Sequence, residues 1–214
     1  HCSDTNCTAA TITPLDETDD VGGRPSITIG ADGLGLISYY DKTNDDLKVA
    51  HCSNTNCTSA TIAALDETGD VGEYTSLTIG ADGLGLISYR DVTNGDLKVA
   101  HCSDTNCTAA TITPLDETGN VGWYTSITIG ADGLGLISYT DFTNAALKVA
   151  HCSDTNCTSA TITALDETDN VGWYTSITIG ADGLGLISYY DNPNGDLKVA
   201  HCENAFCAPY FRRR

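Results

Sequence analysis

Cysteine and histidine recur together at a fixed spacing, and they are the first residues of this chain that could do chemistry. The 214-residue sequence contains ten cysteines in five C-x4-C pairs, each with a histidine before its first cysteine. The pairs are Cys2/Cys7, Cys52/Cys57, Cys102/Cys107, Cys152/Cys157 and Cys202/Cys207. An even, regular set of this kind predicts five short disulfides and export to an oxidising compartment. Zinc is the alternative because Cys and His are its usual ligands, whereas the C-x-x-C-H motif of c-type haem is absent.

Acidic residues in two loops of each repeat could supply oxygen ligands for calcium. The better candidate is the Asp-Glu-Thr loop with Asp66, Glu67 and Asp70, because this motif is present in all four repeats. In the second loop, Asn94-Gly95 predicts a hairpin turn, and the third repeat carries Ala145-Ala146 there. We therefore expect no firm metal site and no required cofactor. For the Asp-Glu-Thr loop, calcium binding is one interpretation, and a solvated acidic loop without a metal is the other.

The sequence offers few candidates for catalysis. Each histidine occupies the same place beside a cysteine, and no Ser-His-Asp spacing stands out from the repeat itself. Paired carboxylates occur in every loop, so none is distinguished as the acid and base of a glycosidase. These observations predict that the protein is not an enzyme.

Aromatic residues mark the segments in which the repeats differ most, residues 19–25 and 40–46 and their equivalents. Both segments are expected on one face of the fold. The candidate binding face contains Tyr74, Arg90, Trp123, Tyr124, Phe142, Trp173, Tyr174 and Tyr190. Exposed aromatic rings near acidic groups suit a sugar ring or a protein partner. The alternative is that these rings only pack between structural units.

Asn-Cys-Thr occurs in each repeat and satisfies the N-glycosylation pattern. The asparagines are Asn6, Asn56, Asn106 and Asn156. Each lies inside a predicted disulfide loop, which favours a surface position but hinders modification.

Four short strands follow from each repeat of 50 residues. In the second repeat they are 76–80, 84–89, 97–102 and 109–115, with Asp82-Gly83 and Asn94-Gly95 as hairpin turns. No helical period is present. A period near 50 with four antiparallel strands predicts an all-β fold, a β-propeller of four four-stranded blades. A β-solenoid is the alternative.

The two ends of the chain contain an incomplete repeat each. We predict a single propeller domain over residues 1–214, with units 1–50, 51–100, 101–150 and 151–200 and a C-terminal cap at 201–214. The first strand, residues 8–15, is expected to complete the last blade of its own chain or of a neighbour. The predicted assembly contacts are Thr11, Ile12, Tyr210, Phe211, Arg212, Arg213 and Arg214.

The composition excludes several classes of partner. The formal net charge is −19, which disfavours nucleic acids and anionic lipid surfaces. No apolar run approaches the 18 or so residues of a membrane span. An extracellular or cell-surface location is expected, with the chain itself or glycans as partners.

The segments ADGLGLISYYD and LKVAHCSNTNCTSATI together resemble the tandem units of secreted, largely uncharacterised prokaryotic repeat proteins. The resemblance covers essentially the whole chain and implies a β-propeller-like, extracellular protein. It implies no catalytic residues. The GADGLG turn departs from the Asp-box of sialidases, so the resemblance carries no glycosidase activity.

Taken together, the sequence predicts a non-catalytic, exported structural protein that assembles into an extracellular filament or surface layer. The alternative is a monomeric, lectin-like propeller that binds carbohydrate or protein at its Trp/Tyr-rich face.

Overall fold

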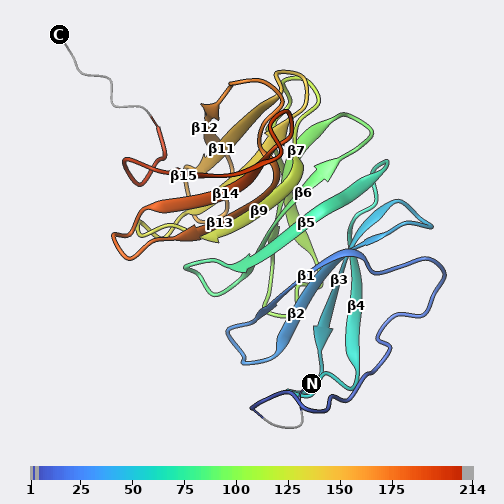
Figure 1. Ribbon diagram of the computed structural model, residues 1–214. Helices are drawn as coiled ribbons and strands as arrows, with labels where there is room; N and C mark the ends of the chain where they lie inside the picture. Colours follow the sequence, from blue (N-terminus) through green and yellow to red (C-terminus); the bar gives the residue numbers. More distant parts are fainter. Residues whose placement is uncertain (1, 3–4, 209–214) are drawn as a thin grey trace.

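Each repeat folds into antiparallel strands joined by tight turns (Figure 1). The computed structural model describes residue 2 and residues 5–208, and these contain 15 strands in four sheets. Blade 1 consists of β1 (Gly23–Ile29), β2 (Gly35–Asp41), β3 (Asp46–Cys52) and β4 (Ala60–Asp66). Blade 2 consists of β5 (Val71–Ile79), β6 (Gly85–Asp91), β7 (Asp96–Cys102) and β8 (Ala110–Asp116). Blade 3 consists of β9 (Trp123–Ile129), β10 (Gly135–Asp141), β11 (Ala146–Cys152) and β12 (Ala160–Asp166). Blade 4 has β13 (Trp173–Ile179), β14 (Gly185–Asp191) and β15 (Asp196–His201).

The hairpins between the first two strands of a blade follow directly from the Gly-Ala-Asp-Gly sequence. In blade 2 the carboxylate of Asp82 accepts a hydrogen bond from the Leu84 amide at 3.0 Å. Gly83 adopts a φ of 82°, a conformation that glycine reaches at little cost. The predicted all-β propeller architecture is confirmed, although the blades begin near the middle of each sequence unit.

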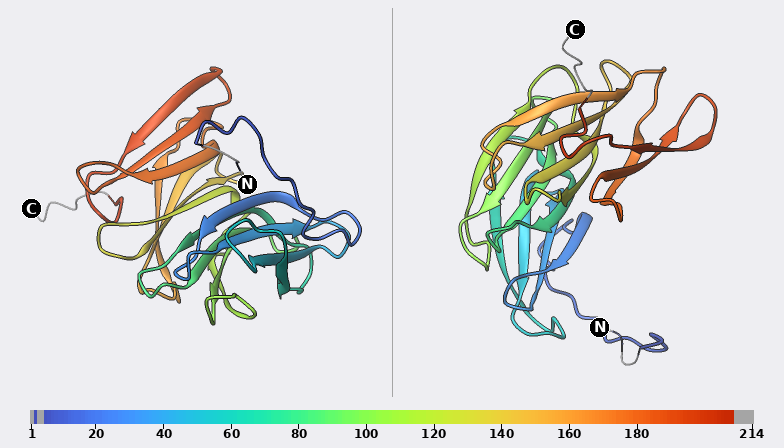
Figure 2. Two further views of the ribbon diagram at one scale, coloured as in Figure 1. Left: turned by 90° about the horizontal axis from the view of Figure 1, so that it is seen from below. Right: turned by 90° about the vertical axis from the view of Figure 1, so that its left-hand side faces the viewer.

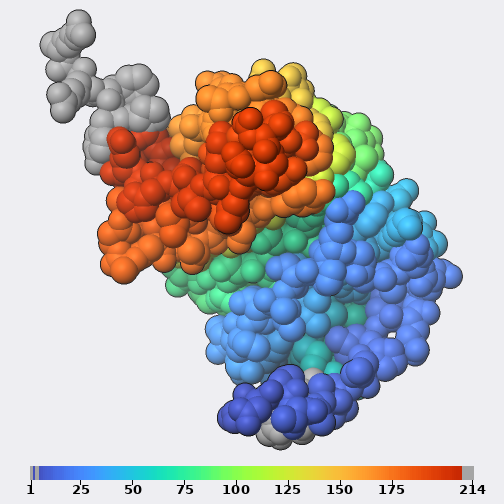
Figure 3. Space-filling model, viewed as in Figure 1, coloured from blue at the N-terminus to red at the C-terminus, as the bar shows by residue number. Residues whose placement is uncertain are grey.

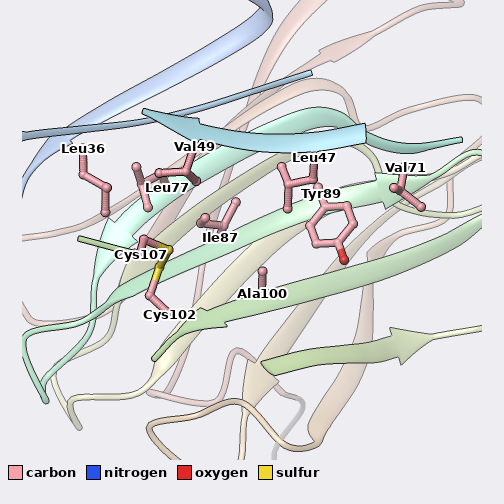
Figure 4. Close-up of a cluster of buried hydrophobic side chains, with 10 residues drawn as sticks. All are labelled: Leu36, Leu47, Val49, Val71, Leu77, Ile87, Tyr89, Ala100, Cys102 and Cys107. Carbon is pink, nitrogen blue, oxygen red and sulfur yellow. A yellow bond between two sulfur atoms is a disulfide. The ribbon is translucent and has the colours of Figure 1, made fainter. Parts of the chain in front are cut away.

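The four sheets follow one another in chain order around a common centre (Figure 2). The first strands of the blades, β1, β5, β9 and β13, are in contact from each blade to the next. Side chains from facing sheets form the core between them (Figure 4). Leu47 and Val49 of blade 1 are fully buried against Leu77, Ile87 and Tyr89 of blade 2. The core is therefore distributed over the interfaces between blades, as expected for repeats that cannot cover their own faces.

A polar link crosses each interface beside this core. The carboxylate of Asp66, at the end of β4, accepts hydrogen bonds from the Tyr89 hydroxyl at 2.7 Å and the Lys98 ammonium at 3.3 Å. Both donors belong to blade 2. Burial and the neighbouring Asp66 raise the pKa of Tyr89, so the phenol remains a donor. Asp16, Asp116 and Asp166 make the same link to the blade that follows each of them.

All ten cysteines form the five predicted disulfides, each between partners five residues apart. The bonds are Cys2–Cys7, Cys52–Cys57, Cys102–Cys107, Cys152–Cys157 and Cys202–Cys207. The zinc alternative falls with them, because no cysteine is free. In blades 1 to 3 the bond joins the third strand to the loop that leads to the fourth strand. It therefore fixes this hairpin covalently.

The second cysteine of each pair has an unusual backbone conformation. Its φ lies between 51° and 54°, in the left-handed region that residues other than glycine seldom adopt. In blade 2 the amide of this cysteine donates to the carbonyl of Asp104 at 3.1 Å, which closes the turn. The five residues with this conformation are Cys7, Cys57, Cys107, Cys157 and Cys207.

Three of these five cysteines are buried in the core. Cys107 and Cys157 are fully buried and Cys207 is 3% exposed, because each packs into the core shared with the preceding blade. Cys57 belongs to blade 1, which no blade precedes, and it is only half-buried. Cys7 belongs to the N-terminal segment and is exposed. Burial of the second cysteine thus depends on a neighbouring blade, which the local spacing does not reveal.

The last blade lacks its fourth strand, and the predicted strand over residues 8–15 is not formed. This segment pairs through a β-bridge between Ala10 and Cys2, outside any named strand. It stays beside blade 1 because Asp16 accepts a hydrogen bond from the Tyr39 hydroxyl at 2.6 Å. Ile12 is consequently 92% exposed, and Thr11 is exposed as well. The chain thus does not complete its own last blade. Completion by a neighbour remains a prediction, and the assembly contacts predicted at 210–214 lie outside the described residues.

The two end blades therefore expose surfaces that are buried elsewhere. Leu197 of β15 is 80% exposed, whereas its equivalent Leu147 in blade 3 is fully buried. Ile27 of β1 is 65% exposed, whereas the equivalent Ile177 in blade 4 is 7% exposed. The N-terminal segment in dark blue and blade 4 in orange and red lie at opposite ends of the face shown in Figure 3.

Candidate binding site at the propeller axis

A bulge in the first strand of every blade determines which side chains reach the centre. The pairing register between the first two strands shifts within residues 23–26, 73–76, 123–126 and 173–176. Arg24, Tyr74, Tyr124 and Tyr174 lie in these bulges with φ between 49° and 54°. Bulges of this kind re-aim a side chain. Here they bring four equivalent side chains to one pocket.

This axial pocket has a volume of about 370 Å³. Two consecutive residues from each blade line it: Arg24 and Pro25, Tyr74 and Thr75, Tyr124 and Thr125, and Tyr174 and Thr175. The threonines are held in place, since Thr125 bonds the Ser88 hydroxyl at 2.8 Å and donates to the Tyr74 carbonyl at 2.8 Å. The volume is in the range of small-ligand sites, which are concave and combine aromatic walls with a few polar groups.

Six aromatic rings form a continuous cluster beside the pocket: Tyr74, Trp123, Tyr124, Phe142, Trp173 and Tyr174. Tyr124 contacts Tyr74 and Tyr174 with ring centroids 4.6 and 4.3 Å apart. Phe142 lies between the two tryptophans, 4.5 Å from Trp123 and 5.0 Å from Trp173. Tyr174 is 62% exposed and both tryptophans are partly exposed. The rings therefore pack across blades and also present surface to solvent.

The edges of these rings carry polar groups with fixed orientations. Asn120 and Asn170 accept hydrogen bonds from the indole nitrogens of Trp123 and Trp173 at 2.8 and 3.0 Å. Burial raises the pKa of Tyr74 and, together with the bonded Tyr174, the pKa of Tyr124. Both phenols are thus neutral donors near pH 7. A pocket with neutral donors and apolar ring faces suits a polyhydroxylated ligand.

Charged residues flank the cluster on the side of blades 1 and 2. The guanidinium of Arg90 lies over Trp123, 4.0 Å from the ring centroid, and that of Arg24 lies over Tyr74 at 3.7 Å. Glu73 pairs with both, at 3.3 Å from Arg90 and 3.5 Å from Arg24. The site is thus aromatic on one side and ionic on the other.

Seven of the eight residues of the candidate binding face lie in this region: the six rings and Arg90. The eighth, Tyr190, is the cross-strand partner of Trp173 in blade 4. Arg24, Pro25, Glu73 and the pocket threonines were missed by sequence reasoning. The sequence does contain a signal for Arg24, because it occupies the repeat position that holds tyrosine in the other three blades.

The calcium candidates do not converge. Asp66 is occupied by Tyr89 and Lys98, and Asp70 accepts a hydrogen bond from Tyr40. Among residue 2 and residues 5–208, no group of three or more His, Cys, Asp or Glu side chains is arranged to hold a metal ion. The asparagines of the four Asn-Cys-Thr motifs are exposed, and their glycosylation remains a prediction.

One pair of carboxylates is brought together by a tyrosine near the ionic side. The hydroxyl of Tyr40 lies 2.8 Å from an oxygen of Asp45 and 2.9 Å from an oxygen of Asp70. Burial and these two carboxylates raise the pKa of Tyr40. Its single proton can be donated to only one carboxylate at a time. Asp45 lies in the loop between β2 and β3 of blade 1, and Asp70 lies in the loop between β4 and β5, which leads into blade 2. The sequence does not reveal that these two loops meet.

Comparisons with known proteins give a match in structure only. No protein-family model matches the chain, and no curated protein matches its sequence. The resemblance to secreted repeat proteins is therefore supported only as a multi-blade β structure.

Solved structures share the fold at low identity. An α-L-arabinanase from Penicillium chrysogenum, complexed with arabinobiose, aligns with a TM-score of 0.63 and 12% identity over 92% of this chain and 68% of its own. An endo-arabinase from Bacteroides thetaiotaomicron aligns with a TM-score of 0.54 and 12% identity over 93% and 80%. A GH43 β-1,3-galactosidase aligns with a TM-score of 0.58 and 10% identity over 89% of this chain. The chain spans about half of that galactosidase, 46% of its length. The shared fold is the β-propeller.

These structures correct two predictions. The expectation of a non-catalytic, filament-forming structural protein is wrong, because solved structures that share this fold include an arabinanase, an endo-arabinase, an arabinofuranosidase and a GH43 galactosidase. The expectation that the chain is not an enzyme is corrected on the same ground. Of the two predicted functions, the alternative of a carbohydrate-binding propeller with a Trp/Tyr-rich face agrees better with these structures.

Proposed function

We propose that this protein is a carbohydrate-active propeller that binds saccharides at the axial pocket. The observation that carries the proposal is the cluster of six rings beside a pocket lined by tyrosines and threonines. Sugar rings combine an apolar C–H face with hydroxyl edges, so they bind best where an aromatic face adjoins hydrogen-bonding groups. Both components are contributed by adjacent blades.

The proposed binding mode places a sugar ring on the exposed surface of the Trp123–Phe142–Trp173 row. Hydroxyl groups of the next residue of the ligand then reach the phenols of Tyr124 and Tyr174. The bulges fix the backbone of these tyrosines, so little conformational entropy is lost on binding. The known ligand of a structural neighbour, arabinobiose in the arabinanase, supports a short saccharide as the probe.

Calorimetric titration of arabinan, galactan and xylan oligosaccharides tests this proposal. We expect at least one of them to bind saturably, and Trp173→Ala to weaken its binding about tenfold, the equivalent of about 1.4 kcal/mol. Phe206→Ala is the matched control, because Phe206 is an exposed ring that lies outside the cluster. Equal loss in both variants, or the absence of binding to any of the three classes, would contradict the proposal.

Hydrolysis of the glycosidic bond is a second candidate, favoured by the pair Asp45 and Asp70. Glycosidases use two carboxyl groups, about 5–5.5 Å apart when the configuration is retained. The shared Tyr40 hydroxyl holds this pair close together. Product analysis on the bound oligosaccharide should detect cleavage that Asp45→Asn and Asp70→Asn abolish without loss of binding. Cleavage that survives both substitutions, or no cleavage at all, would exclude this pair.

An extracellular or cell-surface location is also proposed. The five disulfides support it, since such bonds persist in oxidising compartments. No described helix is long and apolar enough to cross a bilayer.

A further inference from the structure

The axial pocket is not symmetric, although the repeat that builds it is. Three of its four equivalent bulge positions hold tyrosine, and the fourth holds Arg24. None of the eight lining residues is acidic. A chain with a formal charge of −19 therefore places a cation, and no anion, in the wall of its axial pocket.

A second arginine shares the carboxylate of Glu73 with Arg24 and is far less accessible. Arg90 is 5% exposed, at a position that holds tyrosine or threonine in the other blades. Its side chain contacts Trp123 and donates to Glu73 at 3.3 Å and to Asn120 at 3.1 Å. Its Nε has no hydrogen-bond partner among the described residues. A buried guanidinium with an unpaired donor is rare, because such a donor loses its hydration without compensation.

Glu73 is the carboxylate that forms ion pairs with both arginines. Glu73 lies 3.3 Å from Arg90 and 3.5 Å from Arg24, and both distances exceed the 2.7–2.9 Å or so of strong charge-assisted bonds. Asp70 also acts on Arg90 electrostatically, whereas the ion-pair partner of Arg24 is Glu73, which it shares with Arg90. Burial lowers the pKa of Arg90 despite Glu73, which agrees with incomplete compensation of its charge. An additional anion near Arg24 would compensate the guanidinium charge that the shared Glu73 leaves incompletely paired.

We propose that the axial site is selective for acidic saccharides, in which a uronic-acid carboxylate pairs with Arg24 while the sugar ring stacks on the aromatic cluster. The planar guanidinium matches a carboxylate with two parallel hydrogen bonds. Arg24 can supply this fork because its side chain is 44% exposed. Glu73 and the ring of Tyr74 hold the Arg24 guanidinium in place. This inference rests on the proposed carbohydrate function and names its substrate class.

The test compares trigalacturonate with its fully methyl-esterified form, which has the same rings without the charges. We expect the wild-type protein to bind the acid at least about tenfold more tightly, because hydrogen bonds between two charged groups are stronger than those to a neutral ester. Arg24→Tyr, which installs the residue of the other three blades, should abolish this preference. Arg24→Gln should do the same without adding a ring. Lys42→Gln is the control, since Lys42 is an exposed cation paired with Asp20 and does not line the pocket.

The outcomes separate the two proposals. Equal affinity for the acid and the ester, or a preference that survives both Arg24 variants, would overturn the selectivity and leave the carbohydrate function standing. Binding of neither form, with neutral oligosaccharides bound normally, would also overturn it. Failure of every saccharide would remove the proposed function itself.

Discussion

The guanidinium of Arg90 lies over the indole ring of Trp123, with its central carbon 4.0 Å from the ring centroid. The first residue belongs to β6 of blade 2 and the second begins β9 of blade 3. This contact joins two blades at the candidate site. It also connects the ionic side of the site to its aromatic side.

A double-mutant cycle should measure this contact. Arg90→Thr introduces the residue that blade 3 carries at the same position, and Trp123→Ala removes the ring. We expect a coupling free energy of about 1 kcal/mol in urea denaturation, as for partly desolvated cation–π pairs. Effects of the two substitutions that add within about 0.3 kcal/mol would show that the stacking does not stabilise the fold.

Substitution by alanine should destabilise the fold more at Gly172 than at Gly22, although the two glycines occupy equivalent positions of the repeat. A Cβ on Gly172 would lie 2.8 Å from the Cα of Leu147 in the preceding blade, whereas a Cβ on Gly22 has nothing within 4 Å. Their φ angles are similar, at 84° and 80°, so both variants pay about 1 kcal/mol for the left-handed conformation. Gly172→Ala should cost roughly 2 kcal/mol more, because it forces two blades apart. Equal melting temperatures for the two variants would contradict this close approach.

Acid should weaken the fold through the aspartates that end the second strands. Burial alone would raise the pKa of Asp41, but bonds from Lys48 and Asn44 lower it to about 2. The unfolded chain, with an ordinary value near 3.8, therefore takes up a proton first as the pH falls. The stabilisation is complete above about pH 4 and is lost as the pH approaches 2. Melting temperatures measured across this window should fall less steeply for Asp41→Asn than for the wild type, and an unchanged slope would refute the assignment.

The unpaired β15 predicts contact between copies of the chain. Its backbone edge is open, and Leu197 and Val199 are 80% and 59% exposed. Residues 10–16 have the same sequence as β8, which pairs with the equivalent strand in blade 2. Sedimentation velocity should show association that rises with concentration and that Leu197→Lys suppresses, because exposed strand edges recruit strands. A strictly monomeric wild type at high concentration would argue against this contact.

Much of the blade could be predicted from the sequence, because its signals are local. The second strand of blade 2 was expected at 84–89 and lies at Gly85–Asp91, and the third was expected at 97–102 and lies at Asp96–Cys102. The turns follow from Asp-Gly and Asn-Gly, and each disulfide from a five-residue separation. These features depend on neighbours in the chain.

The remaining features depend on contacts between distant residues. Residues 10–16 and Ala110–Asp116 are identical in sequence, yet only the second segment is a strand, because only it has a preceding third strand to pair with. Cys7 and Cys107 occupy the same repeat position, but only Cys107 is buried, because only it has a blade to pack against. Tyr124 was expected on the face that carries the variable loops, and the sequence does not reveal that a bulge with a φ of 53° brings it to the axial pocket. None of these results follows from residue type.

Intrinsic fluorescence gives the most direct measurement of the central claim, because Trp123 and Trp173 are the two tryptophans of the chain and both belong to the aromatic cluster. Titration with a saccharide that binds should shift the emission to shorter wavelength and saturate at one ligand per chain, since a stacked sugar ring removes water from the indoles. Binding of a saccharide with no change in emission would place the carbohydrate elsewhere and contradict the axial site.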